Sequence, residues 1–420
     1  MQVIRRKRPE ATTSNNHETR EFFLSCAGKM EEITKAELES IAAEFKLKIT
    51  SVNINKGGIY FRSTIKDAFS AGLHLRTGGR MLLNLKKIYF LNENDFYKKA
   101  IKFDWSSYIS SGRTFKIETK FDLGVDKKLR NSHFMSLKLK DAVVDQIRER
   151  TGTRPTIEKN KPDIFLRSKI VRGKGTLQAH IFVDLFGEPL SRRGYRVAGH
   201  IAPLKEDLAA AIVSKMNISK DTPLIDCMCG SGTVLIEAFL KANNIGPQFL
   251  KINQHKKNKT EYSLFYFDFI SRDDKEALKK VLSKYSKDVI HNLENIKNKN
   301  IKGYDFSKES IALTRKNIKA AGFDKFITVE LQDAQSLAPS FDEGVLFCNP
   351  PYGERLSDEK QLEKLYYNLG ENLKRNFTGY TAWIFTGNPE LRKKISLRTE
   401  KRIPFFNGAI ECRLLKYSLF

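Results

Sequence analysis

The pattern of hydrophobic and polar positions divides the chain into two stretches of different style. In the first stretch, short apolar or alternating runs predict strands, and apolar residues three and four positions apart predict helices. The expected strands are residues 21–28, 57–63, 80–91, 113–121, 163–171 and 177–185. The expected helices are residues 30–45, 65–75 and 136–150. This mixture predicts an α+β unit over residues 21–185.

After Pro223 the pattern becomes a regular alternation of strands and helices. The expected strands are residues 223–228, 302–306, 326–333, 344–351, 381–387 and 409–417. The expected helices are residues 232–242, 308–321, 359–377 and 390–394. Such an alternation predicts an α/β domain with a doubly wound parallel sheet. The lysine-rich residues 243–300 interrupt it, and we interpret them as an insertion whose role the sequence does not show.

Charge changes this picture by pointing to a partner. The chain of 420 residues, long enough for two or three domains, carries a formal net charge of +25. Such an excess favours a polyanionic partner, and nucleic acid is the expected one. A merely basic surface is the alternative.

Other features limit the class of protein. No apolar run approaches the roughly 18 residues of a membrane span, so we expect no membrane insertion. Residues 1–20 are basic and polar, which predicts a disordered tail and no secretory signal. The five cysteines are an odd, scattered set that fits neither a disulfide framework nor a metal site, so we expect a reducing, cytoplasmic setting without bound metal.

The segment D-C-M-C-G-S-G-T, residues 226–233, follows an expected strand and opens an expected helix. Gly230 and Gly232 allow a tight turn and a close approach to a ligand, beside the unpaired N–H groups of a helix N-terminus. No lysine follows the second glycine, unlike in a nucleotide phosphate loop. The Asp226 carboxylate would repel a pyrophosphate but would accept a hydrogen bond from an ammonium group. A glycine turn needed only for packing is the alternative.

Two further acids end the next strands. The Asp305 carboxylate is placed to accept hydrogen bonds from both hydroxyls of a ribose. The Asp333 carboxylate is placed to accept a hydrogen bond from an adenine amino group. Either acid alone fits a solvated strand end or a helix cap. Their regular placement at the carboxyl ends of successive strands favours a ligand site.

The segment Asn349-Pro350-Pro351-Tyr352 follows a hydrophobic strand. The prolines lack N–H donors, so this segment presents carbonyl groups. The Asn349 amide oxygen and the Pro350 carbonyl are then placed to accept from one planar NH₂ group. Tyr352 offers a flat face on which a base can stack. The pattern predicts a site for an exocyclic amine.

In this order the motifs resemble class I S-adenosylmethionine-dependent methyltransferases that act on exocyclic amines. The segments NPPYGERL, DCMCGSGTVLIEA and LSRRGYR followed by APLKEDLAAAI resemble THUMP-domain guanine-N2 RNA methyltransferases, most closely those of bacterial 23S (large-subunit) rRNA. The resemblance extends from Phe22 to the end of the chain, and RNSHFMSLKLKDAVVDQI belongs to a THUMP-like pattern.

The resemblance implies an architecture. A C-terminal class I methyltransferase domain, with a Rossmann-like, seven-stranded and mostly parallel sheet, would follow an N-terminal α+β region of THUMP and ferredoxin-like type that binds RNA. The implied limits are a tail at 1–20, a ferredoxin-like part at 21–65, a THUMP domain at 66–187, and a methyltransferase domain at 188–420 with the insertion at 243–300.

The resemblance also implies roles for single residues, with S-adenosylmethionine as the cofactor. Those expected to hold the cofactor are Asp226, Gly230, Ser231 and Gly232 at its methionine end, Asp305 at the ribose, Asp333 at the adenine, and Ala202, Pro203 and Leu204 closing over it. Those expected to position the target amine are Asn349, Pro350, Pro351 and Tyr352. Those expected to contact RNA are Lys127, Lys128, Arg130, Arg192, Arg193 and Arg196, although a solvated junction face explains the last three equally well.

The implied activity is methylation of the N2 amine of a guanosine in RNA, with 23S rRNA or a pre-50S particle as the expected partner. A tRNA target stays open, because THUMP domains also serve tRNA enzymes. DNA adenine methylation and glutamine methylation of a release factor also fit N-P-P-Y, but an RNA-binding front region disfavours both. A non-catalytic ribosome-assembly factor is the remaining alternative. Some relatives carry a second methyltransferase behind this one, and since this chain stops at Phe420 we expect one modification.

Overall fold

The structure is a computed structural model that describes residues 18–110, 112–127, 130–197, 204–258, 260–297, 299–352 and 359–420. Nearly all of the expected tail therefore lies outside the described residues. Across the ranges that are described, no helix is long and apolar enough to cross a membrane. The same ranges contain no group of three His, Cys, Asp or Glu side chains arranged to hold a metal ion.

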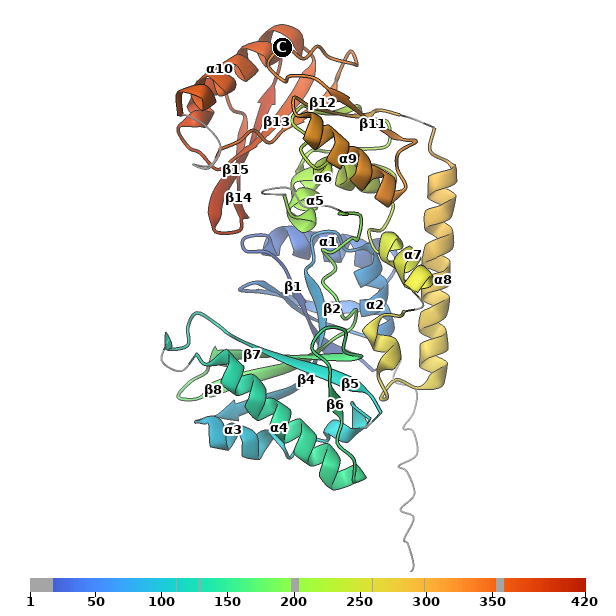
Figure 1. The fold of residues 1–420 in the computed structure, drawn as a ribbon. Helices are drawn as coiled ribbons and strands as arrows, with labels where there is room; N and C mark the ends of the chain where they lie inside the picture. Colours follow the sequence, from blue (N-terminus) through green and yellow to red (C-terminus); the bar gives the residue numbers. More distant parts are fainter. Residues whose placement is uncertain are drawn as a thin grey trace, which may run out of the picture.

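The N-terminal part is built on one eight-stranded sheet in the order β2-β3-β1-β4-β8-β7-β5-β6 (Figure 1). Its strands are β1 (Arg20–Ser25), β2 (Ile49–Asn55), β3 (Gly58–Ser63), β4 (Arg80–Phe90), β5 (Thr114–Phe121), β6 (Thr156–Ile157), β7 (Ile164–Arg172) and β8 (Leu177–Asp184). The long strand β4 pairs with β1 through residues 80–83 and with β8 through residues 82–90. It therefore joins two smaller units into one sheet.

Helices cover one face of this sheet. They are α1 (Glu31–Glu44), α2 (Ile65–His74), α3 (Glu93–Ala100), α4 (Ser132–Thr151) and the 3₁₀ turn η1 (Trp105–Ser107). Side-chain caps begin three of them, because Thr64, Asn92 and Asn131 each accept from a backbone N–H in the first turn. Alternate strand residues such as Phe22 and Leu83 are fully buried against these helices.

All strands and helices expected in this part are present, and four of the described elements were missed: β2, β6, α3 and the three-residue turn η1. Strand β2 is a largely exposed edge strand with little hydrophobic pattern, and β6 has two residues. Helix α3 has eight residues, of which Phe96 and Ala100 alone are buried. Elements this short or this exposed leave almost no periodic signal in the sequence.

The C-terminal part is built on a seven-stranded sheet in the order β11-β10-β9-β12-β13-β15-β14. Its strands are β9 (Leu224–Asp226), β10 (Ile301–Asp305), β11 (Ile327–Leu331), β12 (Gly344–Cys348), β13 (Tyr380–Thr386), β14 (Lys401–Asn407) and β15 (Ile410–Ser418). The pairs from β11 to β13 are parallel, and β15 runs antiparallel to both of its neighbours. The expected α/β class and the mostly parallel, seven-stranded sheet are confirmed. Strand β14, a proline-containing edge strand, was not expected.

Both faces of the second sheet are buried. The helices are α5 (Glu206–Lys215), α6 (Thr233–Ala242), α9 (Lys308–Ala321) and α10 (Glu359–Asn376), with the 3₁₀ turn η4 (Leu391–Ile395) in place of the last expected helix. Leu224 packs in one core with residues of α5, α6 and α9, and its neighbour Ile225 packs in a second core with residues of α10. This alternation places the two helical layers on opposite faces.

The insertion forms α7 (Phe249–Asn258), the 3₁₀ turn η3 (Ser263–Tyr266) and the long helix α8 (Arg272–Glu294), which runs alongside both parts of the molecule (Figure 1). The ring of Phe69 on α2 lies 5.7 Å from that of Tyr262 and 6.1 Å from that of Phe265. Tyr285 on α8 meets His74 edge to face at 5.0 Å. The insertion therefore fastens the N-terminal part to the C-terminal part, a role that charge composition did not reveal.

Candidate functional site

Three of the predicted site residues lie at the ends of neighbouring strands at the centre of the second sheet: Asp226 and Asp305 are the last residues of β9 and β10, and Asn349 follows β12. Strand β9 lies between β10 and β12, with Asp226 opposite Gly303 on one side and opposite Phe347 on the other. Asp305 and Asn349 come two residues after these partners. Because the strands are parallel, their carboxyl ends share one edge, where open α/β sheets bind their ligands.

The glycine loop, residues 227–232, connects β9 to α6 in a conformation that needs its glycines. Gly230 and Gly232 have φ of 54° and 76°, in the left-handed region. A Cβ atom on Gly232 would lie 2.7 Å from the Thr314 side chain. Thr314 donates to the Gly230 carbonyl at 2.7 Å, and Asn317 donates to the Ser231 carbonyl at 2.9 Å. Helix α9 thus fixes the loop.

Two buried carboxyl groups stand beside this loop. Asp226 is 2% exposed and accepts from the Met228 N–H, while Asp305 accepts from the N–H groups of Gly230 and Ser307. Burial, reinforced by the negative charge of Asp305, raises the pKa of Asp226 to about 8. The pair therefore favours a ligand that brings positive charge.

Asp333 lies two residues beyond the end of β11 and is exposed. Its carboxylate accepts from the backbone N–H of Gln335 at 2.9 Å and from the side chain of the same residue. Directly after Asp305, the side chain of Phe306 is 75% exposed. An exposed ring next to a carboxylate offers a flat surface for a base. Sequence analysis missed Phe306, although the aromatic residue after the strand-ending acid was visible.

Asn349 carries an unused acceptor. Its Oδ1 atom is buried and has no hydrogen-bond partner among the described residues. A buried amide oxygen without a donor is costly, and an incoming N–H group would satisfy it. The Pro351 carbonyl already accepts from the Tyr366 hydroxyl at 3.3 Å, which anchors the segment to α10.

The Tyr352 side chain is held at its hydroxyl end. Asn407 donates to the Tyr352 oxygen at 3.0 Å, and the Cys412 sulfur lies 3.7 Å from it. Gly387 makes room for the ring, because a Cβ there would lie 2.8 Å from a Tyr352 ring carbon. The hairpin of β14 and β15 therefore sets the orientation of the Tyr352 ring. One face of this ring is predicted to stack on a base.

Of the three residues predicted to close over a cofactor, Leu204 is described and is 7% exposed. Its carbonyl accepts from Arg196, whose guanidinium also contacts Glu206 and the Thr233 hydroxyl. Ala202 and Pro203 lie outside the described residues. Arg196 is thus engaged within the protein, at the first residue of α6.

The residues predicted to contact RNA separate into different groups. Lys127 and Arg192 are exposed, and Lys128 lies outside the described residues. Arg130 donates to the carbonyls of Val125 and Leu123, and so braces its own loop. The prediction for Arg193 is wrong, because this side chain is 0% exposed and is occupied inside the protein.

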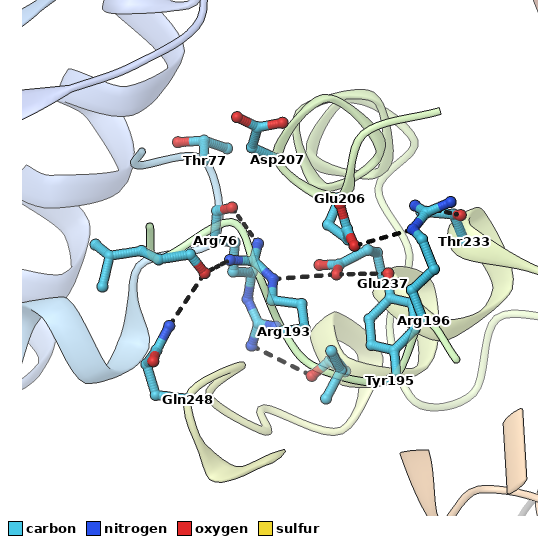
Figure 2. A network of polar contacts seen from close by, with 12 residues as sticks. Arg76, Thr77, Arg193, Tyr195, Arg196, Glu206, Asp207, Thr233, Glu237 and Gln248 are labelled. Carbon is cyan, nitrogen blue, oxygen red and sulfur yellow. Dashed lines mark hydrogen bonds and ion pairs between the residues drawn. The ribbon is translucent and has the colours of Figure 1, made fainter. Parts of the chain in front are cut away.

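Arg193 lies at the centre of a buried polar network between the two parts of the molecule (Figure 2). Its Nε atom donates to Glu237 of α6 at 3.2 Å, and its other nitrogens donate to the carbonyls of Leu190 and Arg76. The Tyr195 hydroxyl donates to the same Glu237 oxygen at 3.2 Å. Burial raises the pKa of the Glu237 carboxyl, and the Arg193 charge opposes that rise.

Arg76 extends the network into the N-terminal part. Its guanidinium donates to the carbonyl of Leu240 at 3.2 Å, near the C-terminal end of α6, where a cation also interacts favourably with the helix dipole. The same helix begins at the glycine loop. Helix α6 therefore connects the candidate site to the N-terminal sheet.

Comparison with known families agrees with this architecture. Residues 193–416 match the family described as RMKL-like, methyltransferase domain. Residues 91–179 match the THUMP domain, and residues 21–82 match the RlmL ferredoxin-like domain. The first match covers more than half of the chain. The chain therefore belongs to the RMKL-like methyltransferase family, which confirms the resemblance seen in its motifs.

Individual relatives are similar over nearly the whole chain. The proteins named ribosomal RNA large subunit methyltransferase K/L from Desulfotalea psychrophila and Syntrophotalea carbinolica are each 32% identical, over 94% and 95% of this chain. The chain covers 52% and 53% of them, so it spans about half the length of these relatives.

Solved structures share the fold. SMU.472, solved in complex with SAH, matches with a TM-score of 0.79 at 23% identity, covering 96% of this chain and 99% of that one. TrmN from Thermus thermophilus matches with a TM-score of 0.65 at 17% identity, covering 96% of this chain and all of that one. These likenesses confirm the expected fold class, with a methyltransferase fold behind the N-terminal region.

The buried network predicts how far the free energy of unfolding falls when the Glu237 carboxylate is removed. In Glu237→Ala the Arg193 charge stays buried without its partner, so we expect unfolding to become easier by about 3–5 kcal/mol, measured by urea denaturation. Glu237→Gln, which retains an acceptor for Arg193 and Tyr195, should lose less. As a surface control, Glu276→Ala breaks an exposed pair with Lys279 and should change stability by less than about 1 kcal/mol. A Glu237→Ala variant as stable as this control would contradict the account.

Proposed function

We propose that this protein transfers a methyl group from S-adenosylmethionine to the exocyclic N2 amine of a guanosine in RNA, with large-subunit rRNA as the substrate. The observation that carries the proposal is the Oδ1 atom of Asn349, which is buried and has no hydrogen-bond partner in the described part of the chain, at the shared edge of the sheet beside Asp226. Membership of a methyltransferase family supplies the reaction class.

The residues at this edge fit the cofactor. S-adenosylmethionine brings an ammonium group and a sulfonium, and the buried carboxyl groups of Asp226 and Asp305 favour such positive charge. We assign Asp226 and the glycine loop to the methionine end, Asp305 to the ribose, and Asp333 and Phe306 to the adenine. Ala202, Pro203 and Leu204 are proposed to close over it. SMU.472, which shares the fold, was solved with SAH.

The target group follows from the acceptors. An exocyclic amine has two N–H donors, and Asn349 Oδ1 together with the Pro350 carbonyl supplies two acceptors for them. Accepting both hydrogens favours a pyramidal nitrogen and the positive charge that develops on it during transfer. Tyr352, oriented by Asn407 and Cys412, stacks on the base that carries the amine.

The protein must also align the amine nitrogen with the methyl group of the cofactor. The methyl group of the cofactor is activated by its sulfonium, so catalysis requires the amine nitrogen to be held close to it and in line. The fixed glycine loop and the braced Asn349–Tyr352 segment provide that geometry. A guanosine in single-stranded or looped RNA reaches the site most easily, because a base in a duplex must first be unstacked.

RNA as the substrate rests on three observations. The net charge of +25 favours a polyanion, residues 91–179 match a THUMP domain, and the relatives named above are large-subunit rRNA methyltransferases. We propose residues 21–187 as the RNA-binding region and residues 188–420 as the methyltransferase domain. Lys127 and Arg192, which are exposed, are proposed RNA contacts.

Cofactor binding should release a proton. At pH values near 6.5, Asp226 with its pKa of about 8 is largely protonated, and a bound cation would drive that proton off. Calorimetry in buffers of different ionisation enthalpy should show a release that approaches one proton near pH 6.5 and falls toward zero at pH values above about 9. The affinity should rise with pH over the same range. Asp226→Asn should bind more weakly and without this release. Binding by the natural protein with no proton release would remove Asp226 from the cofactor site.

Asn349→Ala should separate binding from chemistry. The variant loses an oriented acceptor for the amine, so turnover should fall by about a hundredfold or more while cofactor affinity stays within about twofold. Calorimetry and single-turnover methyl transfer measure the two quantities. Asn253→Ala, at an exposed position of helix α7, is the matched control and should change neither. Equal losses of affinity and turnover in Asn349→Ala would contradict the assigned role.

The substrate is tested by methyl transfer from tritiated S-adenosylmethionine to unmodified large-subunit rRNA, small-subunit rRNA and tRNA in parallel, followed by nucleoside analysis. We expect N2-methylguanosine in large-subunit rRNA alone. The same nucleoside in tRNA alone would overturn the assigned substrate. Absence of label from all three, with cofactor bound, would overturn methylation of free RNA.

A further inference from the structure

Two amide side chains in series connect helix α10 to the loop that follows β11. The Asn368 amide, on α10, donates to Oε1 of Gln335 at 2.8 Å. The Gln335 amide in turn lies against both carboxylate oxygens of Asp333, at 3.3 Å from Oδ1 and 3.1 Å from Oδ2. A carboxylate only accepts hydrogen bonds, so the Gln335 nitrogen faces it and the Gln335 oxygen faces Asn368.

The hydrogen-bonding capacity of the Asp333 carboxylate is used unevenly. Its Oδ1 atom accepts from the backbone N–H of Gln335 at 2.9 Å as well as from the Gln335 side chain. Among the described residues, Oδ2 accepts from that side chain alone. Because a carboxylate oxygen has two lone pairs, Oδ2 retains the capacity for one further N–H donor. An adenine amino group supplies such a donor.

The backbone of this loop is held by contacts other than those of Gln335. Asn372, which is 6% exposed on α10, donates to the carbonyls of Ala334 at 2.9 Å and of Leu337 at 3.0 Å. The Ala334 and Leu337 side chains are buried in the core that contains residues of α10. The backbone on both sides of Gln335 is therefore fixed already, and the Gln335 side chain adds an orientation of the Asp333 carboxylate.

We infer that Gln335 is a positioning residue for recognition of the adenine amino group, and that Asn368 acts through Gln335. This inference rests on the proposed assignment of Asp333 to the adenine and extends it to the residue that orients this acid. Asp333 is exposed, so without a partner its side chain would sample several rotamers. A carboxylate that is already oriented loses less conformational freedom when the cofactor binds, which raises the affinity.

Two other roles for Gln335 make different predictions. If the side chain only stabilised the loop, its loss would weaken the binding of every ligand of the domain to the same extent. If it occupied the place of the adenine amino group until the cofactor displaced it, its loss would strengthen binding. Positioning predicts a loss of affinity that is confined to ligands carrying the amino group.

The test compares the affinity of the full chain for S-adenosylhomocysteine and for its deamino analogue, in which a hydrogen replaces the adenine amino group, by calorimetry without RNA. The natural protein should prefer S-adenosylhomocysteine by at least about tenfold, because the amino group donates to a charged acceptor. Gln335→Ala should bind S-adenosylhomocysteine about fivefold more weakly and the analogue within about twofold of the natural protein. Asn368→Ala should lower the preference by a smaller factor.

Further variants separate the amide of Gln335 from its packing. Gln335→Met keeps the length of the side chain without the amide and should behave like Gln335→Ala. The matched control is Gln178→Ala on β8, where the side chain donates to the Tyr89 hydroxyl at 3.3 Å in the N-terminal sheet. This variant should leave both affinities unchanged. Adding Gln335→Ala to Asp333→Ala should cause no further loss of affinity, because Gln335 acts through that carboxylate.

Equal weakening of both ligands in Gln335→Ala would overturn the inference in favour of loop stabilisation, and tighter binding of S-adenosylhomocysteine would overturn it in favour of displacement. A natural preference retained by Asp333→Ala would remove Asp333 from the adenine site, and the inference would fail with it. None of these results depends on RNA or on methyl transfer. Failure of the inference is therefore distinguishable from failure of the proposed activity on guanosine.

Discussion

The buried pair of Arg193 and Glu237 is the constraint on which the arrangement of the two parts depends. Both side chains are almost fully excluded from solvent, so neither charge has water to stabilise it and each needs the other in place. Glu237 belongs to α6, which starts at the glycine loop, and Arg193 reaches back to the carbonyl of Arg76 in the N-terminal part. A shift of the N-terminal part against the C-terminal part would break the hydrogen bond from Arg193 to the Arg76 carbonyl and leave the buried guanidinium short of an acceptor.

This constraint gives the candidate site a fixed relation to the N-terminal sheet. The insertion adds a second fastening through Tyr262, Phe265 and Tyr285, which pack against α2. In the account proposed here, RNA held on the N-terminal part would meet an active site whose position is already set. Recognition of the RNA and placement of its guanosine would then both depend on the same rigid arrangement of the two parts. Efficient alignment of two reactants requires such an arrangement.

Much of the geometry of the candidate site was predictable because its residues lie at or directly after the ends of strands. Asp226, Asp305 and Asn349 are far apart in the sequence, but parallel neighbouring strands bring their ends to one edge. Thr314 and Asn317, which hold the glycine loop, were missed because a polar residue within an amphipathic helix gives no sign of what it contacts. Arg193 was misassigned for a related reason. In R-R-G-Y-R the sequence does not show which arginine is buried, and only the tertiary contact with Glu237 separates it from exposed Arg192.

The central claim is that Asn349 and Pro350 accept the two hydrogens of the guanine N2 amine. The most direct test is transfer of tritiated methyl from S-adenosylmethionine to two forms of the same large-subunit rRNA transcript, one containing guanosine and the other inosine, which lacks that amine. The account predicts label in the guanosine transcript and none above background in the inosine transcript. Equal labelling of the two would contradict it, because the methyl group would then be going to an atom other than guanine N2.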